Sequence, residues 1–309
     1  MIISASRRTD IPAFYAQWFI NRTRAGYCVV PNPFNPRQVA QVALEPEQVE
    51  TIVFWTRNPR PLFPCLEELD QRGYRYYFQY TLMNNPRVMD PKTPAAKAAL
   101  DTFRKLSDRV GPARVVWRYD PIVFSSITDP EFHLRTYTTL ARALRSYTFR
   151  SVVSIIDLYP KVDARLGQLK DRGVTLTPHE RLPAGRLASL MRALASTAAE
   201  NGMEITSCAE TIDLAPYGIR PGKCIDDELI GRVFGIQVTG KKDPSQRKAC
   251  GCVVSKDIGM YDTCPFGCLY CYATTSFDRA RIHHREHRPD TPSLVSRRNG
   301  DSSRFPGLL

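Results

Sequence analysis

The chain has 309 residues, of which 43% are hydrophobic and 24% are charged, which is typical of a globular protein and excludes a disordered or fibrous class. No run of about 18 apolar residues occurs, and charged residues already stand at positions 7, 8 and 10, so we expect no membrane span, no signal peptide and a cytoplasmic protein. The net charge of +12 favours anionic partners, although its even spread is also that of a solvated basic surface.

Apolar, β-branched and aromatic stretches alternate with amphipathic stretches along the first two thirds of the chain. The expected strands are 1–6, 51–56, 74–82, 114–123, 151–158 and 203–207. The expected helices are 13–24, 62–72, 94–109, 132–147, 162–172 and 183–201. This alternation indicates parallel strands with helical crossovers. Because no glycine-rich phosphate loop follows the first strand, we prefer a full or partial (β/α) barrel to a doubly wound nucleotide-binding sheet.

Polar side chains follow the ends of these strands, which is where a β/α fold places its chemistry. They are Arg7, Arg8, Asp10, Thr56, Arg57, Asn58, Asn84, Asn85, Arg118, Asp120, Asp157, Cys208 and Glu210. Each one alone is an ordinary loop-capping or salt-bridging residue. Together they predict a ring of polar groups around one mouth of the barrel.

After residue 212 the sequence becomes rich in turns and then in cysteine. We expect a short helix at 226–234, another at 274–285, and a disordered basic tail after it. The predicted division is 1–212 for the barrel body, 213–285 for a cysteine-rich iron–sulfur segment that completes the barrel, and 286–309 for the tail.

The nine cysteines are the unusual feature of the composition, because five of them fall between positions 250 and 271. An odd number argues against a disulfide framework. Cys264, Cys268 and Cys271 have the spacing C-x3-C-x2-C. Three thiolates on one short loop can hold three irons of a cubane cluster and leave the fourth iron open to a small molecule.

This spacing, together with the sequence GCLYCYA from position 267, resembles the cluster loop of radical S-adenosylmethionine enzymes, in particular the group that includes spore photoproduct lyase-like proteins. The resemblance implies a [4Fe-4S] cluster on Cys264, Cys268 and Cys271, with S-adenosylmethionine on its open iron and Tyr270 packed near the adenine. It also implies a 5′-deoxyadenosyl radical that abstracts hydrogen from a substrate, and an electron donor such as flavodoxin or ferredoxin. The substrate stays open, and nucleic acid is one class.

In that superfamily the loop follows the first barrel strand, whereas here it lies near the C-terminal end. The resemblance therefore implies a circular permutation, in which a strand at 252–256, the loop and a helix at 274–285 lie beside the strand at 1–6. The stretches SRRTDIP from position 6 and WRYDP from position 117 also resemble the domain-of-unknown-function 1848 family. That second resemblance spans about residues 1–275 and brings no established activity.

If the radical chemistry holds, the strand-end residues divide into cofactor and substrate roles. We expect Arg7, Arg8 and Asp10 to contact the methionine carboxylate, the ribose or the substrate. Glu210 is expected to bind the ribose hydroxyls or the methionine amino group. Arg118 and Asp120 are the candidate catalytic pair, which binds a polar substrate or in which Asp120 orients Arg118.

Four further cysteines are candidates for a second, fully ligated cluster, since four thiolates close such a site. They are Cys208, Cys224, Cys250 and Cys252. The alternative is that Cys208 and Cys224 are buried apolar fillers, which is the role that we expect for Cys28 and Cys65.

Two other function classes stay open. Pairs such as C-x-C and C-x2-C can build a four-thiolate zinc site, so a zinc-stapled, basic, nucleic-acid-binding protein is the alternative. Three-residue spacing is uncommon in zinc knuckles, however, and the β/α body is larger than such a module needs. A hydrolytic barrel with a His and carboxylate metal site is weaker still, because the five histidines lie away from the strand ends.

Overall fold

An eight-stranded parallel sheet dominates the computed structural model, which describes residues 1–33, 35 and 38–295. The strand order is β10-β1-β4-β5-β6-β7-β8-β9, and every neighbouring pair is parallel. The strands are β1 (Ile2–Ala5), β4 (Thr51–Thr56), β5 (Tyr76–Thr81), β6 (Val115–Ile122), β7 (Arg150–Ile155), β8 (Glu204–Ser207), β9 (Arg220–Pro221) and β10 (Lys256–Asp257). The predicted α/β class with parallel strands is confirmed.

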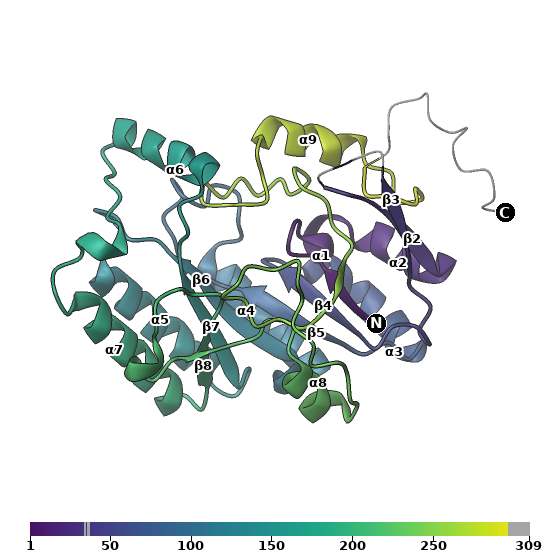
Figure 1. Ribbon diagram of the computed structural model, residues 1–309, viewed down its shortest axis with the longest axis horizontal. Helices are drawn as coiled ribbons and strands as arrows, with labels where there is room; N and C mark the ends of the chain where they lie inside the picture. Colours follow the sequence, from purple (N-terminus) through teal and green to yellow (C-terminus); the bar gives the residue numbers. More distant parts are fainter. Residues whose placement is uncertain (34, 36–37, 296–309) are drawn as a thin grey trace.

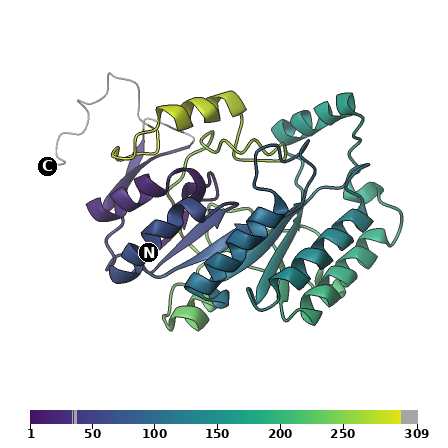
Figure 2. The same ribbon diagram turned by 180° about the vertical axis from the view of Figure 1, so that it is seen from behind.

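Helices connect these strands and cover one face of the sheet. The α-helices are α1 (Ile11–Phe14), α2 (Ala16–Ala25), α3 (Leu66–Gln71), α4 (Ala96–Val110), α5 (Pro130–Leu144), α6 (Pro160–Gly167), α7 (Arg186–Glu200), α8 (Asp227–Phe234) and α9 (Phe277–Glu286). Short 3-10 helices are η1 (Arg60–Cys65), η2 (Pro112–Arg114), η3 (Gln168–Arg172), η4 (His179–Arg181) and η5 (Ala215–Tyr217). In Figure 1 the segment that follows β8, in green, crosses in front of the sheet, and Figure 2 shows the connecting helices on the other face.

The local sequence explains why these helices form where they do. In α4 the buried residues Ala99, Phe103, Leu106 and Val110 recur at intervals of three and four, which places them on one stripe against the sheet. Helix α5 begins after Asp129, whose carboxylate accepts a hydrogen bond from Phe132 N at 2.7 Å and so caps the first turn.

The sheet is buried on both faces, and the two faces pack against different parts of the chain. Along β5, Tyr76 and Phe78 pack with the core beneath the helices. The side chain between them, Tyr77, packs on the opposite face with Ile225 and Val253. Because strand side chains alternate between faces, this pattern shows that the stretch 224–253, which follows β8, forms a second layer on that face.

Some segments differ from their predicted structure. An antiparallel hairpin of β2 (Tyr27–Pro31) and β3 (Val39–Ala43) was not expected, and the strand expected at 252–256 is reduced to β10. In the tail, the backbone oxygen of Thr291 accepts a hydrogen bond from Trp18 Nε1 at 2.9 Å, and Leu294 is 1% exposed. These contacts with the body of the protein correct the expected disorder up to residue 295, whereas 296–309 lie outside the described residues.

The eight-stranded sheet is open at its two edges. Among the described residues no ladder joins β9 to β10, which are the two outermost strands. Within the same part of the chain, no helix is long and apolar enough to cross a membrane.

Candidate functional site

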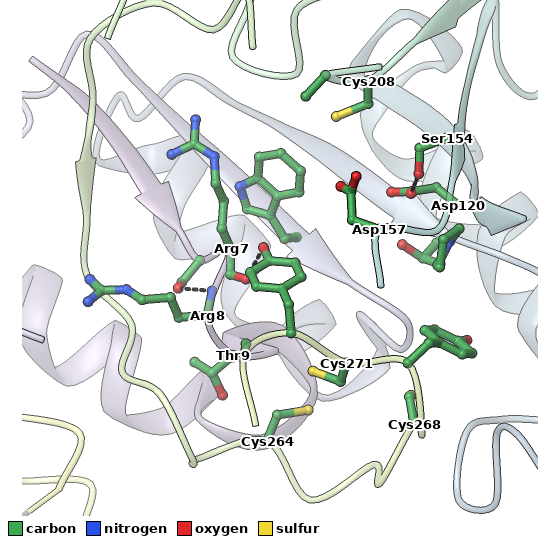
Figure 3. A pocket seen from close by; sticks show the side chains of 18 of the residues that line it. Arg7, Arg8, Thr9, Asp120, Ser154, Asp157, Cys208, Cys264, Cys268 and Cys271 are labelled. Atoms are coloured by element: carbon green, nitrogen blue, oxygen red, sulfur yellow. Dashed lines mark hydrogen bonds between the residues drawn. The ribbon is translucent and has the colours of Figure 1, made fainter. Parts of the chain in front are cut away.

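The carboxyl ends of the parallel strands meet at one edge of the sheet, where the structure has a cavity of about 810 Å³. Residues expected at a common mouth do line this cavity, as Figure 3 shows for several of them. They are Arg7, Arg8, Asp10, Thr56, Arg57, Arg118, Asp120, Asp157 and Cys208. Four other residues expected at this mouth are not among its lining residues, namely Asn58, Asn84, Asn85 and Glu210. The Glu210 carboxylate accepts a hydrogen bond from Ile155 N at 2.8 Å.

The loop from Cys264 to Cys271, which we call the cysteine loop, closes one end of this cavity. All three of its cysteines line the cavity, and in Figure 3 the side chains of Cys264 and Cys271 point toward one another. Burial raises the pKa of the Cys264 and Cys268 thiols, and the charge of Asp10 raises that of Cys264 further. The Arg57 guanidinium opposes the effect of burial at Cys268, because a nearby positive charge favours the thiolate.

A buried polar network ties the cysteine loop to the strand ends. The Tyr270 hydroxyl donates to Asp90 Oδ1 at 2.6 Å and accepts from Arg57 Nη2 at 2.6 Å. Asn85 Nδ2 donates to Asp90 Oδ2 at 3.1 Å. Tyr270, which we expected beside an adenine, therefore has its hydroxyl engaged inside the protein, while its side chain lines the cavity. Sequence reasoning missed Asp90, since no motif marks it.

Strands β1 and β10 are joined through the Asp257 carboxylate. Ser6 Oγ donates to it at 2.6 Å, Arg7 N at 2.8 Å and Arg8 Nε at 3.1 Å. Arg8, a predicted cofactor contact, is therefore held in an ion pair that is largely shielded from solvent. This junction fixes where the chain enters the cavity from β1.

Asp10, also predicted to contact the cofactor, is held by hydrogen bonds from two backbone N–H groups. Its carboxylate accepts from Ala13 N at 3.0 Å, which caps α1, and from Arg57 N at 2.6 Å. Burial raises the Asp10 pKa to about 7, against the lowering effect of these hydrogen bonds. Close by, Thr9 Oγ1 is buried without a hydrogen-bond partner among the described residues, and Thr9 lies beside Cys264 in Figure 3.

Arg118 and Asp120, the candidate catalytic pair, form an ion pair at the end of β6. Arg118 Nε donates to Asp120 Oδ2 at 2.9 Å, and Ser154 Oγ also donates to Asp120. The Arg118 guanidinium lies over the Trp55 ring at 5.0 Å and donates from Nη1 to Cys224 Sγ at 2.7 Å. Asp120 therefore orients Arg118, which reaches from the cavity to a cysteine.

Cys208, Cys224, Cys250 and Cys252, which we call the four-thiol group, line the same cavity from the segment after β8. The sulfurs of Cys208 and Cys224 are 3.1 Å apart. Cys252 Sγ accepts from the backbone N–H groups of Cys224 at 3.3 Å and Ile225 at 3.4 Å. The interaction with Cys252 raises the pKa of the Cys250 thiol, and burial raises it further. The structure thus brings together four cysteines that the sequence separates by up to 44 positions.

The Arg7 side chain lies near Cys252 of the four-thiol group. Burial opposes the charge of its guanidinium, but the nearby Cys252 and Asp257 charges raise the Arg7 pKa. Arg7 Nη2 is buried and has no hydrogen-bond partner within the described ranges. The guanidinium also lies over the Trp55 ring at 5.4 Å.

The two remaining cysteines lie apart from both groups. Cys28 is fully buried in the core beneath the helices, which confirms its predicted role as filler. Cys65 is partly buried at the end of η1 and packs against the same core.

Nowhere in the described part of the chain do three His, Cys, Asp or Glu side chains converge on one point as the ligands of a single metal ion do. A cubane cluster makes a different demand, because each of its irons takes one thiolate and the thiolates therefore stand farther apart.

Comparison with known proteins gives a family and no activity. The family model described as Domain of unknown function (DUF1848) matches residues 2–273, a range that contains the whole cavity apart from Thr275. No curated protein matches the chain.

Proposed function

The chain belongs to the DUF1848 family, and from the geometry of its cavity we propose that it is a radical S-adenosylmethionine enzyme. Cys264, Cys268 and Cys271 hold a [4Fe-4S] cluster in this proposal. The observation that carries it is that these three closely spaced thiols line the same cavity, of about 810 Å³, as the polar strand ends. A purely structural metal site has no need of an adjoining cavity of this size.

The residues present fit such a cluster in two respects. The loop supplies three soft thiolate donors and no fourth cysteine, which matches a cluster with one open iron. Thr9 also lines the cavity, and its buried Oγ1 has no partner in the described part of the protein, which leaves one donor for a polar group bound there.

The topology supports the permuted barrel that the resemblance implies. Strand β10 pairs in parallel with β1, with Ile3 opposite Lys256, and the cysteine loop and then α9 follow it. A strand, a cluster loop and a helix therefore adjoin β1 although they come last in the chain. We propose that the open sheet is an incomplete barrel whose cluster-bearing unit has moved from the first place to the last.

When bound and reduced, the cluster and S-adenosylmethionine supply a 5′-deoxyadenosyl radical that takes a hydrogen atom from the substrate. The protein positions the reactants. The Arg57, Asp90 and Tyr270 network holds the cysteine loop against the strand ends. The buried Thr9 Oγ1 would be a donor to the bound cofactor.

Arg118, oriented by Asp120, binds a polar group of the substrate in this proposal. Arg8, Arg57, Arg118 and Arg247 line the cavity but are each paired with an aspartate, whereas Arg7 and Lys161 add positive charge to its walls, and the chain carries a net charge of +12. An anionic substrate fits this charge, and nucleic acid is one such class. The same charge suits a negatively charged electron donor such as flavodoxin or ferredoxin.

Single Cys→Ser variants at 264, 268 and 271 test the proposal, with Cys65→Ser as the matched control. Each loop variant is expected to lower the formation of 5′-deoxyadenosine from S-adenosylmethionine by more than about 100-fold, because a lost ligand costs more than a lost supporting contact. Cys65→Ser is expected to keep full activity. Unchanged 5′-deoxyadenosine formation in the loop variants would contradict the proposal, as would zinc without iron in protein purified anaerobically.

A further inference from the structure

The four-thiol group lies away from the cysteine loop and has no part in the activity proposed above. Its members come from the end of β8, from the turn before α8 and from the C-x-C stretch before β10. Cys224, Cys250 and Cys252 are buried and Cys208 is partly buried. A fold that gathers four thiols from three separate segments into one place calls for a specific explanation.

An apolar filler role does not fit the surroundings of these thiols. Arg118 Nη1 donates to Cys224 Sγ at 2.7 Å, and two backbone N–H groups donate to Cys252 Sγ. These thiols pack beside apolar side chains as Cys28 does, but among the described residues no hydrogen-bond donor contacts the Cys28 sulfur, and a filler cysteine needs none. Hydrogen-bond donors and a cation aimed at sulfur are instead the surroundings of metal-bound thiolates.

The room around the thiols favours a cluster over a single ion. The sulfurs of Cys208 and Cys224 are 3.1 Å apart. They have to separate to hold either kind of metal centre, since thiolates stand about 3.8 Å apart around one zinc, given Zn–S bonds of about 2.3 Å, and farther apart around a cubane. Because all four residues line the cavity of about 810 Å³, there is room for a body larger than one ion.

We propose that Cys208, Cys224, Cys250 and Cys252 bind a second iron–sulfur cluster, closed by four thiolates. Arg118 and Arg7 supply positive charge next to it, and the buried Arg7 Nη2, which lacks a partner among the described residues, gains one in a cluster sulfur. The backbone N–H groups of Cys224 and Ile225 donate to the Cys252 thiolate. Since all four positions carry protein ligands, S-adenosylmethionine has no open iron here.

Metal analysis of five anaerobically purified proteins tests this proposal. They are the wild type, Cys208→Ser, Cys252→Ser, the matched control Cys65→Ser, and the triple variant Cys264→Ser, Cys268→Ser, Cys271→Ser. Iron, zinc and acid-labile sulfide are measured per chain. With a cluster in each place, the wild type holds about eight irons and as many sulfides. We expect Cys208→Ser and Cys252→Ser to lose about half of both, the triple variant to keep about half, and Cys65→Ser to lose none.

The triple variant keeps the test decisive if either single variant fails to fold, because its remaining iron reports on the four-thiol group alone. Zinc in that variant, or no metal at all, would overturn the proposal. The result is different if the cysteine loop holds no cluster. The wild type would then contain only about four irons. Cys208→Ser would lose this iron, and the triple variant would keep it.

Discussion

Asp90 is the residue that links the cysteine loop to the body of the protein. It is 3% exposed, and its carboxylate has Tyr270, Asn85 and Arg57 as partners. Burying a carboxylate is costly unless donors and a cation surround it, as they do here. The loop position that contributes most to this network is Tyr270, whose hydroxyl joins Asp90 to Arg57.

Replacing Tyr270 by Phe is expected to weaken the attachment of the cysteine loop to Asp90 and Arg57, while the aromatic ring stays in place. The variant leaves Asp90 and Arg57 each short of one buried hydrogen bond, which costs about 1–3 kcal/mol of the free energy of unfolding. Anaerobic urea unfolding followed by tyrosine and tryptophan fluorescence measures the loss. Tyr261→Phe, at a 39% exposed position of the same segment, serves as the control. Equal stability of the two variants would contradict the structural role given to Tyr270.

His133 allows a prediction at the same scale that is independent of the metal sites. It is fully buried in α5, where its ring contacts the Tyr119 hydroxyl at 3.0 Å and Val123 O at 3.1 Å. Burial lowers the His133 pKa to about 4, because the charged imidazolium would lose its hydration. NMR of ¹⁵N-histidine-labelled protein, with His133→Gln to assign the signal, should show no titration of this ring between pH 8 and pH 5. A midpoint near 6.5 would contradict the buried placement.

At the scale of elements, the contact between β1 and the chain after β10 leaves no space for a side chain at Gly259. A Cβ atom there would lie 2.0 Å from Ser6 Oγ and 2.5 Å from Ser6 Cβ. Ser6 cannot move freely, since its hydroxyl donates to Asp257 at 2.6 Å. The close approach of these two segments therefore depends on glycine.

Gly259→Ala is expected to destabilise the protein by about 1–3 kcal/mol, because the added methyl group overpacks this junction. Gly167→Ala, at the end of α6, is the control, since nothing lies within 4 Å of a Cβ at that position. Thermal unfolding of both variants measures the difference. A melting temperature for Gly259→Ala equal to that of Gly167→Ala would show that β10 does not lie against β1 as described.

Long elements were predictable from sequence and very short ones were not. The expected strand 51–56 coincides with β4, because its apolar run is buried apart from the half-buried Trp55. Strands β9 and β10 have two residues each, which is too short for any periodic pattern, and their place depends on pairing with β8 and β1. The hairpin of β2 and β3 was missed, and β3 is exposed over its first three residues, so it lacks the alternating pattern of a half-buried strand.

The same reasoning separates the parts of the candidate site. Parallel strands made it predictable that Arg118, Asp120 and Cys208 share one cavity. The cysteine loop carried a recognisable spacing. The assignment of partners was not predictable, because Asp257 holding Arg8 and Arg7 lying beside Cys252 depend on contacts between segments some 250 positions apart.

At the scale of the whole molecule, charge makes a prediction about the electron donor. The chain carries a net charge of +12, so the proposed donor, a negatively charged flavodoxin or ferredoxin, would be attracted over a distance that salt shortens. Raising the ionic strength from about 0.05 M to about 0.3 M is expected to slow cluster reduction by such a donor about tenfold. Stopped-flow absorbance measures this rate. An uncharged small reductant is the control, and a donor rate independent of salt would contradict the role given to the charge.

The whole molecule also divides its cysteines between different packing layers. Helices pack on one face of the sheet, and the stretch 224–253 packs on the other with Cys224, Cys250 and Cys252. The cavity lies at the strand ends, with the cysteine loop and the four-thiol group both lining it. In the two proposals above, the substrate lies between the two metal centres.

The central claim is that the cysteine loop holds a cluster with an open iron. An EPR spectrum of the anaerobically purified, reduced protein, recorded with and without S-adenosylmethionine, tests it most directly. We predict the signal of a reduced [4Fe-4S] cluster that changes shape when S-adenosylmethionine is added, while a closed cluster on the four-thiol group would not respond. A spectrum that S-adenosylmethionine leaves unchanged would contradict the claim.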